Sequence, residues 1–367
     1  MPEITASPPT DPMSAPTAAP TATVVIGGTI AIDHVKTPAA EAQGLLGGSA
    51  AYAALAASFY CRPVGLIGII GRDFPQAHLD MLEARGIFLT GVERSENESF
   101  TWSGEYHENM NERTTHRVGL NVLENWRVRV PSEAAASTVV VLANMSPDNQ
   151  LEMLAQCGLL DRAGIAVSSD SSHPHSSLPH PQSSSSRVVI ADTMDLWISI
   201  ANERLHEVLP HLDLFVLNEG EARELAGSSN LVRAGRILLD KGPRHVVIKL
   251  GEFGAMLFSA SSSSQSSIPN PQSPISTGFF RCSAWPLESV ADPTGAGDTF
   301  LGAIAGYLAA QGPPPYSASA LRQAVIQGSI LASFTCEAFS TQRLESLQPA
   351  ELSARLAQFR EATEWGV

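Results

Sequence analysis

A regular alternation of short β-branched runs with helical patterns along most of the chain is the feature that most constrains its fold. Six apolar runs are typical of strands that are buried on both faces of a parallel sheet. They lie at residues 23–27, 63–69, 138–143, 187–192, 214–217 and 245–250. Helical patterns lie between them, at residues 49–59, 77–85, 150–157 and 230–241. This alternation predicts a doubly wound, mainly parallel α/β sheet with helices on both faces and right-handed crossovers.

Polar residues stand at or just beyond the ends of the predicted strands. They are Asp33, Asn144, Asp192, Asn218 and Lys249. Doubly wound sheets bind their ligands at the carboxyl ends of the strands. We therefore expect one cleft along that edge of the sheet.

The run from Asp292 to Thr299, with the sequence DPTGAGDT, opens directly into an amphipathic helix over about 296–311. Gly295, Ala296 and Gly297 are small, so their amides can approach an anion closely, and the helix dipole adds to the attraction. Asp298 falls in the first turn, where a carboxylate can accept a proton from a hydroxyl facing the same anion. This arrangement predicts phosphoryl transfer to a small molecule. The alternative is an ordinary Gly-rich cap with an acidic first turn.

Further segments agree with that interpretation, in one order along the chain. They are GTIAID at 28–33, GGSAAYAA at 47–54, GLIGIIGRD at 65–73, NEGE at 218–221, KLGEFG at 249–254 and DPTGAGD at 292–298. Together they resemble the motifs of the ribokinase/PfkB family of carbohydrate kinases, over roughly residues 23–345. The resemblance implies a ribokinase-like fold with a small β lid, and ATP-dependent phosphorylation of a primary hydroxyl on a sugar or a sugar-like compound.

The resemblance also implies roles on the phosphate side. Asp298 would be the base, and the amides of Gly295, Ala296 and Gly297 would form the anion hole. Asn218 and Glu221 would organise Mg²⁺ and its waters, although a helix N-cap is an equally good interpretation of that pair. The nucleotide would be contacted by Asn218, Lys249, Gly251, Gly254 and Thr294. A K⁺ ion would be held by Asp292 and the Thr294 carbonyl, unless Asp292 only caps the following turn.

On the acceptor side, the carboxylate of Asp33 can accept two hydrogen bonds from vicinal hydroxyls. The glycines Gly47 and Gly48 would let backbone come close to the acceptor. The remaining contacts are assigned to Tyr52 and Asn144. Tyr52 stands where the family commonly has an Asn, and Ala31 replaces another amide. These changes disfavour ribose itself and leave other sugars, sugar acids or a nucleoside open. A nucleoside kinase and a non-catalytic sugar- or nucleotide-sensing protein are the alternatives.

The chain is expected to divide into a kinase domain at 23–347 and a C-terminal helix at 348–367. The lid is expected from about 35–46 and 98–126. Residues 1–22 are rich in Pro, Thr and Ala and are predicted to be a disordered tail. Two Ser- and Pro-rich stretches, 168–186 and 259–277, are predicted to be disordered surface insertions, the second within a β-hairpin.

Composition excludes several classes of function. The 23 basic and 37 acidic residues give a net charge of −14, which disfavours binding to nucleic acid or to anionic membranes. The four cysteines are scattered without a CxxC pair, so neither a zinc site nor a disulfide framework is indicated. We expect a cytoplasmic protein whose partners are ATP and a small-molecule acceptor, and which dimerises through the β lid.

Overall fold

The computed structural model describes residues 23–160, 186–260 and 278–364. The predicted tail at 1–22 lies outside the described residues, as does nearly all of the two Ser-rich stretches. The last residues, 365–367, are also outside them.

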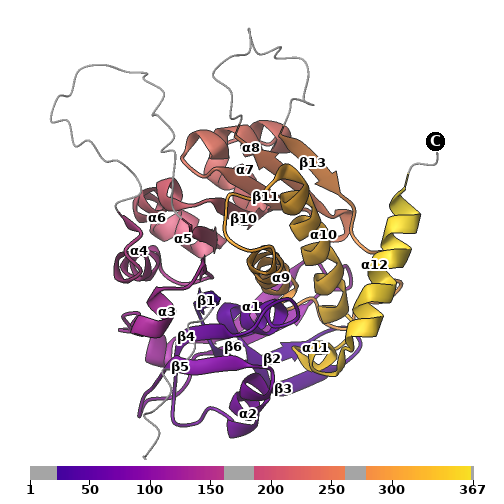
Figure 1. Cartoon of the computed structure of the whole chain (residues 1–367). Coiled ribbons are helices and arrows are strands. Elements are labelled where there is room, and N and C mark those ends of the chain that lie inside the picture. Colours follow the sequence, from indigo (N-terminus) through magenta and orange to yellow (C-terminus); the bar gives the residue numbers. More distant parts are fainter. Residues whose placement is uncertain (1–22, 161–185, 261–277, 365–367) are drawn as a thin grey trace, which may run out of the picture.

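A nine-stranded sheet forms the centre of the described part of the chain, in the order β13-β12-β11-β10-β9-β8-β1-β4-β5 (Figure 1). Its strands are β1 (Val24–Gly27), β4 (Val64–Ile70), β5 (Ile87–Arg94), β8 (Val139–Leu142), β9 (Val188–Asp192), β10 (Leu214–Asn218), β11 (His245–Lys249), β12 (Ala255–Ser259) and β13 (Phe279–Cys282). The pairs β11–β12 and β12–β13 are antiparallel, and the other neighbours are parallel. The predicted doubly wound, mainly parallel sheet is confirmed.

Helices cover both faces of this sheet because successive side chains of each strand point to opposite sides. Val24 and Ile26 belong to one hydrophobic core, and Val25 belongs to the other. The first core is covered by α1 (Ser49–Ala57), α2 (Gln76–Ala84), α9 (Ala296–Ala310), α10 (Ala318–Thr335), α11 (Gln342–Ser346) and α12 (Pro349–Thr363). The second is covered by α3 (Ser132–Ala135), α4 (Pro147–Gln156), α5 (Asp195–Ile200), α6 (Asn202–Val208), α7 (Glu219–Ala226) and α8 (Leu231–Asp240).

Helices α1 and α9 pack backbone against backbone. A methyl group on Gly302 would come within 2.1 Å of the Ala53 carbonyl oxygen, and one on Gly306 would come within 2.6 Å of the Ala57 carbonyl oxygen. Only glycine therefore permits this separation of the two helices. This close contact holds α9 beside α1, β1 and β8. The residues that were predicted to bind the phosphate acceptor belong to the same part of the chain.

A second, four-stranded sheet has the order β3-β2-β6-β7 and matches the predicted β lid. Its strands are β2 (Ala31–Lys36), β3 (Glu41–Gly47), β6 (Thr101–Tyr106) and β7 (Arg113–Gly119). Val35, Leu45 and Tyr106 form a small hydrophobic cluster inside it. The lid begins a few residues earlier than predicted, so that Asp33 lies on a lid strand.

Short 3₁₀ turns complete the described chain: η1 (Asn121–Leu123), η3 (Leu209–His211) and η4 (Gly251–Phe253). No described helix is long and apolar enough to cross a membrane.

Candidate active site

The residues that were predicted to form an anion hole lie at the N-terminus of α9. Gly295 is its N-cap residue and has the left-handed conformation, with φ at 76°, which glycine adopts without strain. The Ala296 amide donates to the Pro293 carbonyl at 3.2 Å, so Ala296 is already used by a turn. Among the described residues, the amides of Gly295, Gly297 and Asp298 have no backbone acceptor outside the helix. These three amides therefore have no described acceptor, whereas the predicted Ala296 amide bonds within the turn.

A lysine stands directly over this helix N-terminus. A methyl group on Gly297 would come within 2.8 Å of Lys249 Nζ, so the ammonium group lies against the first turn of α9. Burial raises the pKa of the neighbouring Asp298 carboxyl, and the positive charges of Lys249 and Arg113 oppose that rise. The site therefore combines free amides, one ammonium group and one partly buried carboxylate.

The NxxE element begins α7 as a reciprocal capping box. The Asn218 amide donates to Glu221 Oε2 at 2.8 Å, and the Glu221 amide donates to Asn218 Oδ1 at 2.9 Å. The N-cap interpretation of this pair is thus what the structure displays. It leaves the other Glu221 carboxylate oxygen available, and burial raises the pKa of that carboxyl.

Asp192 is a functional candidate to which the sequence analysis gave no role. It ends β9, it is only 4 % exposed, and its Oδ1 atom makes no hydrogen bond. Burial, and then the charge of Asp298, raise the pKa of Asp192 well above its ordinary value, whereas Lys249 lowers it. The sequence feature that could have identified Asp192 is a carboxylate at the carboxyl end of a predicted strand.

The acceptor side of the site centres on Asp33, which is only 4 % exposed. Its carboxylate packs on Gly47 so closely that a methyl group there would come within 2.1 Å. Burial, together with the charges of Asp292 and Asp298, raises the pKa of Asp33 to about 8. Asp33 and Asp298 were predicted from motifs that are distant in the sequence, and in the structure the charge of Asp298 acts on Asp33.

Tyr52 lies beneath the anion hole. A methyl group on Gly295 would come within 2.3 Å of the Tyr52 ring, so the ring supports the loop that presents the amides. The Tyr52 hydroxyl is buried near Asp33 and Ser340 but makes no hydrogen bond. Its ring packs inside the protein, and the predicted role of Tyr52 in contacting the acceptor is untested by this geometry.

Gly48 and Asn144 were also predicted to contact the phosphate acceptor, and both lie near the start of α1. Gly48 is the N-cap of α1 with φ at 91°, and the Ser49 hydroxyl donates to the Asn144 carbonyl at 3.1 Å. The Asn144 side chain is partly engaged, because Trp197 Nε1 donates to Asn144 Oδ1 at 2.8 Å. Asn144 therefore joins α5 to the start of α1.

Two glycines of the predicted nucleotide motif differ in what surrounds them. Gly251 has φ at 56° and faces open space, with Asn111 Oδ1 of the lid 3.7 Å from an added methyl group. A methyl group on Gly254, by contrast, would come within 2.0 Å of the Cys282 carbonyl oxygen. Gly254 is thus required by strand packing, whereas Gly251 leaves room for a ligand.

Asp292 joins two loops. Its side chain is fully buried, and it accepts hydrogen bonds from the Thr294 amide at 2.9 Å and the Ser340 amide at 3.0 Å. The Thr294 hydroxyl donates to the Tyr106 hydroxyl at 3.3 Å, which ties the loop before α9 to the lid.

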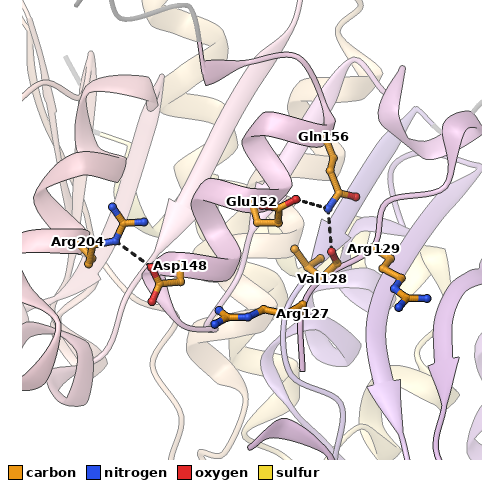
Figure 2. Close-up of a pocket in the computed structure, with 7 residues that line it drawn as sticks. All are labelled: Arg127, Val128, Arg129, Asp148, Glu152, Gln156 and Arg204. Carbon is orange, nitrogen blue, oxygen red and sulfur yellow. Dashed lines mark hydrogen bonds and ion pairs between the residues drawn. The ribbon is translucent and has the colours of Figure 1, made fainter. Parts of the chain in front are cut away.

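A surface cavity of about 480 Å³ is lined by none of the predicted site residues (Figure 2). It is lined by Arg127, Val128, Arg129, Asp148, Glu152, Gln156 and Arg204. An ion pair between Arg204 and Asp148, at 2.9 Å, closes one side. Acidic and basic groups are mixed around the cavity, so its charge selects no class of ligand.

The fold and the site together define a ribokinase-like α/β protein with a β lid over the end of its sheet. The family model of the pfkB family carbohydrate kinases matches residues 181–347, which include the NxxE element and the DPTGAGD motif. These observations confirm the resemblance of the chain to the ribokinase/PfkB family.

The chain is also similar to individual proteins. The chain is 24 % identical over 287 residues to the cytidine kinase of Thermococcus kodakarensis, with 77 % of this chain and 88 % of that protein covered. Among solved structures, it is similar to a putative ribokinase II from Escherichia coli in complex with ATP and Mg²⁺, with a TM-score of 0.67 and 17 % identity over 92 % of this chain and 99 % of that one. It is also similar to the nucleoside kinase of Burkholderia thailandensis in complex with inosine, with a TM-score of 0.64 and 18 % identity over 93 % and 98 % of the two chains.

Proposed function

We propose that the protein transfers the terminal phosphoryl group of ATP to a primary hydroxyl of a sugar or a nucleoside. The observation that carries this proposal is the N-terminus of α9, where free amides, the Lys249 ammonium group and the partly buried Asp298 carboxylate converge. In phosphoryl transfer, catalysis consists mainly of positioning and of stabilising the charge on the transferred oxygens. Those amides and that ammonium group supply the stabilisation, and Asp298 supplies the proton acceptor.

In the proposed mechanism the acceptor hydroxyl donates a hydrogen bond to Asp298. As the bond from its oxygen to phosphorus forms, the hydroxyl becomes more acidic and its proton moves to the Asp298 carboxylate. The amides of Gly295, Gly297 and Asp298 stabilise the negative charge on the transferred group, and Lys249 adds a full positive charge on the same side. The acceptor hydroxyl loses one proton, Asp298 gains it, and ADP leaves.

The residues present fit ATP with Mg²⁺. Asp192, Glu221 and Asp298 place three carboxyl groups around one ammonium group, and the buried Asp192 Oδ1 atom is without a partner. No described group of three or more acidic, His or Cys side chains has the geometry of a direct metal site. Octahedral Mg²⁺ commonly keeps several waters, so Glu221 and Asp192 would hold the ion through water. When bound, Mg²⁺ neutralises phosphate charge.

Two classes of acceptor fit the site. Asp33 can accept hydrogen bonds from two neighbouring hydroxyls, which sugars and the ribose of nucleosides both offer. The similarity to a cytidine kinase, which covers 88 % of that protein, favours a nucleoside. The family model of carbohydrate kinases favours a sugar.

Release of ADP by the full-length chain, measured with MgATP and a panel of sugars, sugar acids and nucleosides, tests the proposal. We expect at least one acceptor to support turnover, and the same panel with Asp298→Asn protein to support almost none. A wild-type chain that binds MgATP but phosphorylates nothing in the panel would favour the sensing protein. Turnover by the Asp298→Asn variant at the wild-type rate would contradict the proposed chemistry.

A further inference from the structure

We propose that Glu337 is a positioning residue for the anion hole, because it fixes the segment 336–340 that holds the loop before α9 in place. This segment is called the clamp segment below. The inference rests on the proposed function and adds to it a contribution of the C-terminal helix α12 to the reaction. Glu337 touches neither the acceptor nor the nucleotide in this proposal, so its effect on the reaction passes through the loop.

The clamp segment and the loop before α9 are joined by two hydrogen bonds. The Ala291 amide donates to the Cys336 carbonyl at 2.8 Å. The Ser340 amide donates to Asp292 Oδ2 at 3.0 Å. Each end of the clamp segment therefore contacts the loop whose later residues present the amides at the start of α9. A shift of the clamp segment would move that loop with it.

The backbone of the clamp segment has a conformation that its own residues do not favour. Ser340 has φ at 54°, in the left-handed region that residues other than glycine rarely adopt. Such a conformation persists where the surrounding structure imposes it. The bonds of Ser340 to Asp292 and to the Leu46 carbonyl restrain one end of the clamp segment. Glu337 lies near the other end.

Both carboxylate oxygens of Glu337 are paired with arginines. Arg343 Nε donates to Glu337 Oε2 at 2.9 Å, and an amino group of Arg355 donates to Glu337 Oε1. The three side chains are 15–25 % exposed, so water screens these ion pairs less than it screens pairs on an open surface. Glu337 thereby joins the clamp segment to α11, through Arg343, and to α12, through Arg355.

Arg355 is itself held by packing between α12 and α10, which contact each other (Figure 1). Its guanidinium lies 3.5 Å from the centroid of the Phe334 ring and 5.3 Å from that of the Trp285 ring. It also donates to the Ser333 hydroxyl at 2.9 Å. Cation–π contacts of a partly desolvated guanidinium add to the hydrogen bond. Arg355 therefore restrains Glu337 as an ordered group and not as a mobile surface charge.

Restraint of the loop matters because phosphoryl transfer depends on where the hydrogen-bond donors stand. A misplacement of about 1 Å, caused by a change far from the chemistry, can cost about a hundredfold in rate. Loss of the Glu337 charge should therefore lower kcat by displacing the amides. The contacts of the acceptor with Asp33 would stay, so the KM for the acceptor should change little.

One test is steady-state ADP release by the full chain, with an acceptor that the panel identifies, in Glu337→Gln, Arg355→Gln and Glu337→Asp variants. Arg360→Gln is the matched control, because Arg360 lies on the same helix, is exposed and loses the same charge. We expect Glu337→Gln and Arg355→Gln each to lower kcat by about tenfold and to change the acceptor KM by less than about twofold. Glu337→Asp should retain more activity than Glu337→Gln, and Arg360→Gln should change neither constant.

The double variant Glu337→Gln/Arg355→Gln separates a coupled pair from two independent effects. The two residues act as one unit in this proposal, so the double variant should be no slower than the slower single variant. A kcat equal to the wild-type value in Glu337→Gln, or additive losses in the double variant, would overturn the proposal.

A second measurement does not require turnover. Hydrogen exchange of residues 291–298 in the ligand-free chain reports on the bonded amides of Ala291 and Thr294. We expect Glu337→Gln to speed exchange there by about tenfold and to leave exchange of β10 unchanged. Unchanged exchange at 291–298 overturns the positioning role even if the chain is a kinase, as does equally faster exchange in β10. Faster exchange at 291–298 alone, in a chain that phosphorylates nothing in the panel, retains the coupling and overturns only the proposed function.

Discussion

Two aspartates of the same site, Asp298 and Asp33, have different surroundings, and these separate their tasks. Asp298 lies at a helix N-terminus beside Lys249, and both features favour its charged form. Asp33 has no such cation, and Asp292 and Asp298 act on it as like charges. Lys249 therefore favours the ionised form of Asp298, which can accept a proton, whereas Asp33 has a pKa of about 8 and changes its charge near neutral pH.

Substitution of Asp298 by Asn should abolish nearly all turnover while nucleotide affinity stays within a few-fold of the wild type. Asp298 acts on the acceptor proton rather than on the bound nucleotide, so the loss should appear in kcat. Removal of a general base costs on the order of 10²–10⁴ in rate. Steady-state ADP release and MgADP binding measure the two effects. A variant with more than about half of the wild-type kcat would show that Asp298 is not the base.

Acceptor affinity should increase as the pH rises through about 8, the pKa of Asp33. The ionised carboxylate accepts hydrogen bonds from two hydroxyls, whereas the protonated form accepts them less well. The expected result is a KM for the acceptor that falls between pH 7 and 9, at saturating MgATP, by up to about tenfold per pH unit. The control is Asp33→Asn, whose KM should be high and independent of pH over that range. A wild-type KM that is flat between pH 7 and 9 would contradict this assignment.

The stability of the ligand-free protein should show the opposite trend. The folded-state pKa of Asp33 lies above its ordinary value of 3.8, so burial of the protonated form is favourable relative to burial of the ion. That contribution is fully present below the ordinary pKa and is lost as the pH rises through about 8. That loss is spread over the pH range from about 4 to about 8, so the melting temperature of the wild type should fall more between pH 5 and 8 than that of Asp33→Asn.

The sequence predicts those site residues whose relative positions are set by neighbours in the chain. The phosphate loop and Asp298 are adjacent in the chain, so a short motif determines their geometry. Lys249 lies over Gly297, and Asp192 feels the charges of Lys249 and Asp298, only because the fold brings the ends of β9 and β11 near the N-terminus of α9. A contact of that kind depends on tertiary packing, which the motif spacing alone does not specify.

At the scale of elements, strands buried on both faces were predicted to within one or two residues, because continuous apolar runs mark them. The edge strand β5 was missed, since Ile87–Arg94 is half exposed and ends in charged residues. The capping box of α7 illustrates a different limit. Asn218 and Glu221 satisfy two backbone amides of their own helix, so the same spacing serves a cap and is compatible with a water-mediated metal site.

The contact between α1 and α9 should be intolerant of a single methyl group. Gly302→Ala would place its Cβ atom within 2.1 Å of the Ala53 carbonyl oxygen. Overpacking of this kind costs about 1–3 kcal/mol, which should lower the melting temperature by several degrees. The control is Gly220→Ala in α7, where an added methyl group meets only the Asn218 side chain at 3.2 Å. Thermal unfolding of both variants measures the difference. Equal melting temperatures for Gly302→Ala and the wild type would show that the helices can separate freely.

At the scale of the whole molecule, the chain carries a long Ser-rich stretch between two paired strands. The Ser259 amide donates to the Gly278 carbonyl at 2.8 Å, and the Phe258 and Phe279 rings pack 5.2 Å apart. The β12–β13 hairpin is therefore closed by its own residues. Replacing 261–277 with Asn-Gly should leave kcat within about twofold and the melting temperature nearly unchanged, because a polar tract contributes little buried area and a shorter loop closes at less entropic cost.

The control for this replacement is a chain in which the sequence of 261–277 is scrambled. Both chains should behave like the wild type. A melting temperature lower by about ten degrees in the Asn-Gly chain, when the scrambled chain is unaffected, would show that the length of the segment matters to the fold.

Asp292 connects three distant parts of the molecule, and a monovalent cation there should act on all of them. Its carboxylate holds the Thr294 and Ser340 amides, and the Ser340 hydroxyl donates to the Leu46 carbonyl of lid strand β3. Burial disfavours the ionised form of Asp292 and so raises its pKa, and a cation beside the carboxylate would offset that cost. By its resemblance to the family, the chain is expected to bind K⁺ at this junction. The competing interpretation is that the two amides already satisfy the carboxylate.

We expect K⁺ to raise kcat several-fold by fixing the loop that presents the Gly295 and Gly297 amides, with little effect on the pH dependence set by Asp298. Rates are measured in buffer free of K⁺ and Na⁺, then with each ion added at equal ionic strength. Asp292→Asn is the matched variant: it keeps an oxygen for one amide but loses the charge, so its rate should be low and should not respond to K⁺. Equal wild-type rates in all three buffers would show that hydrogen bonds from Thr294 and Ser340 alone hold the junction together.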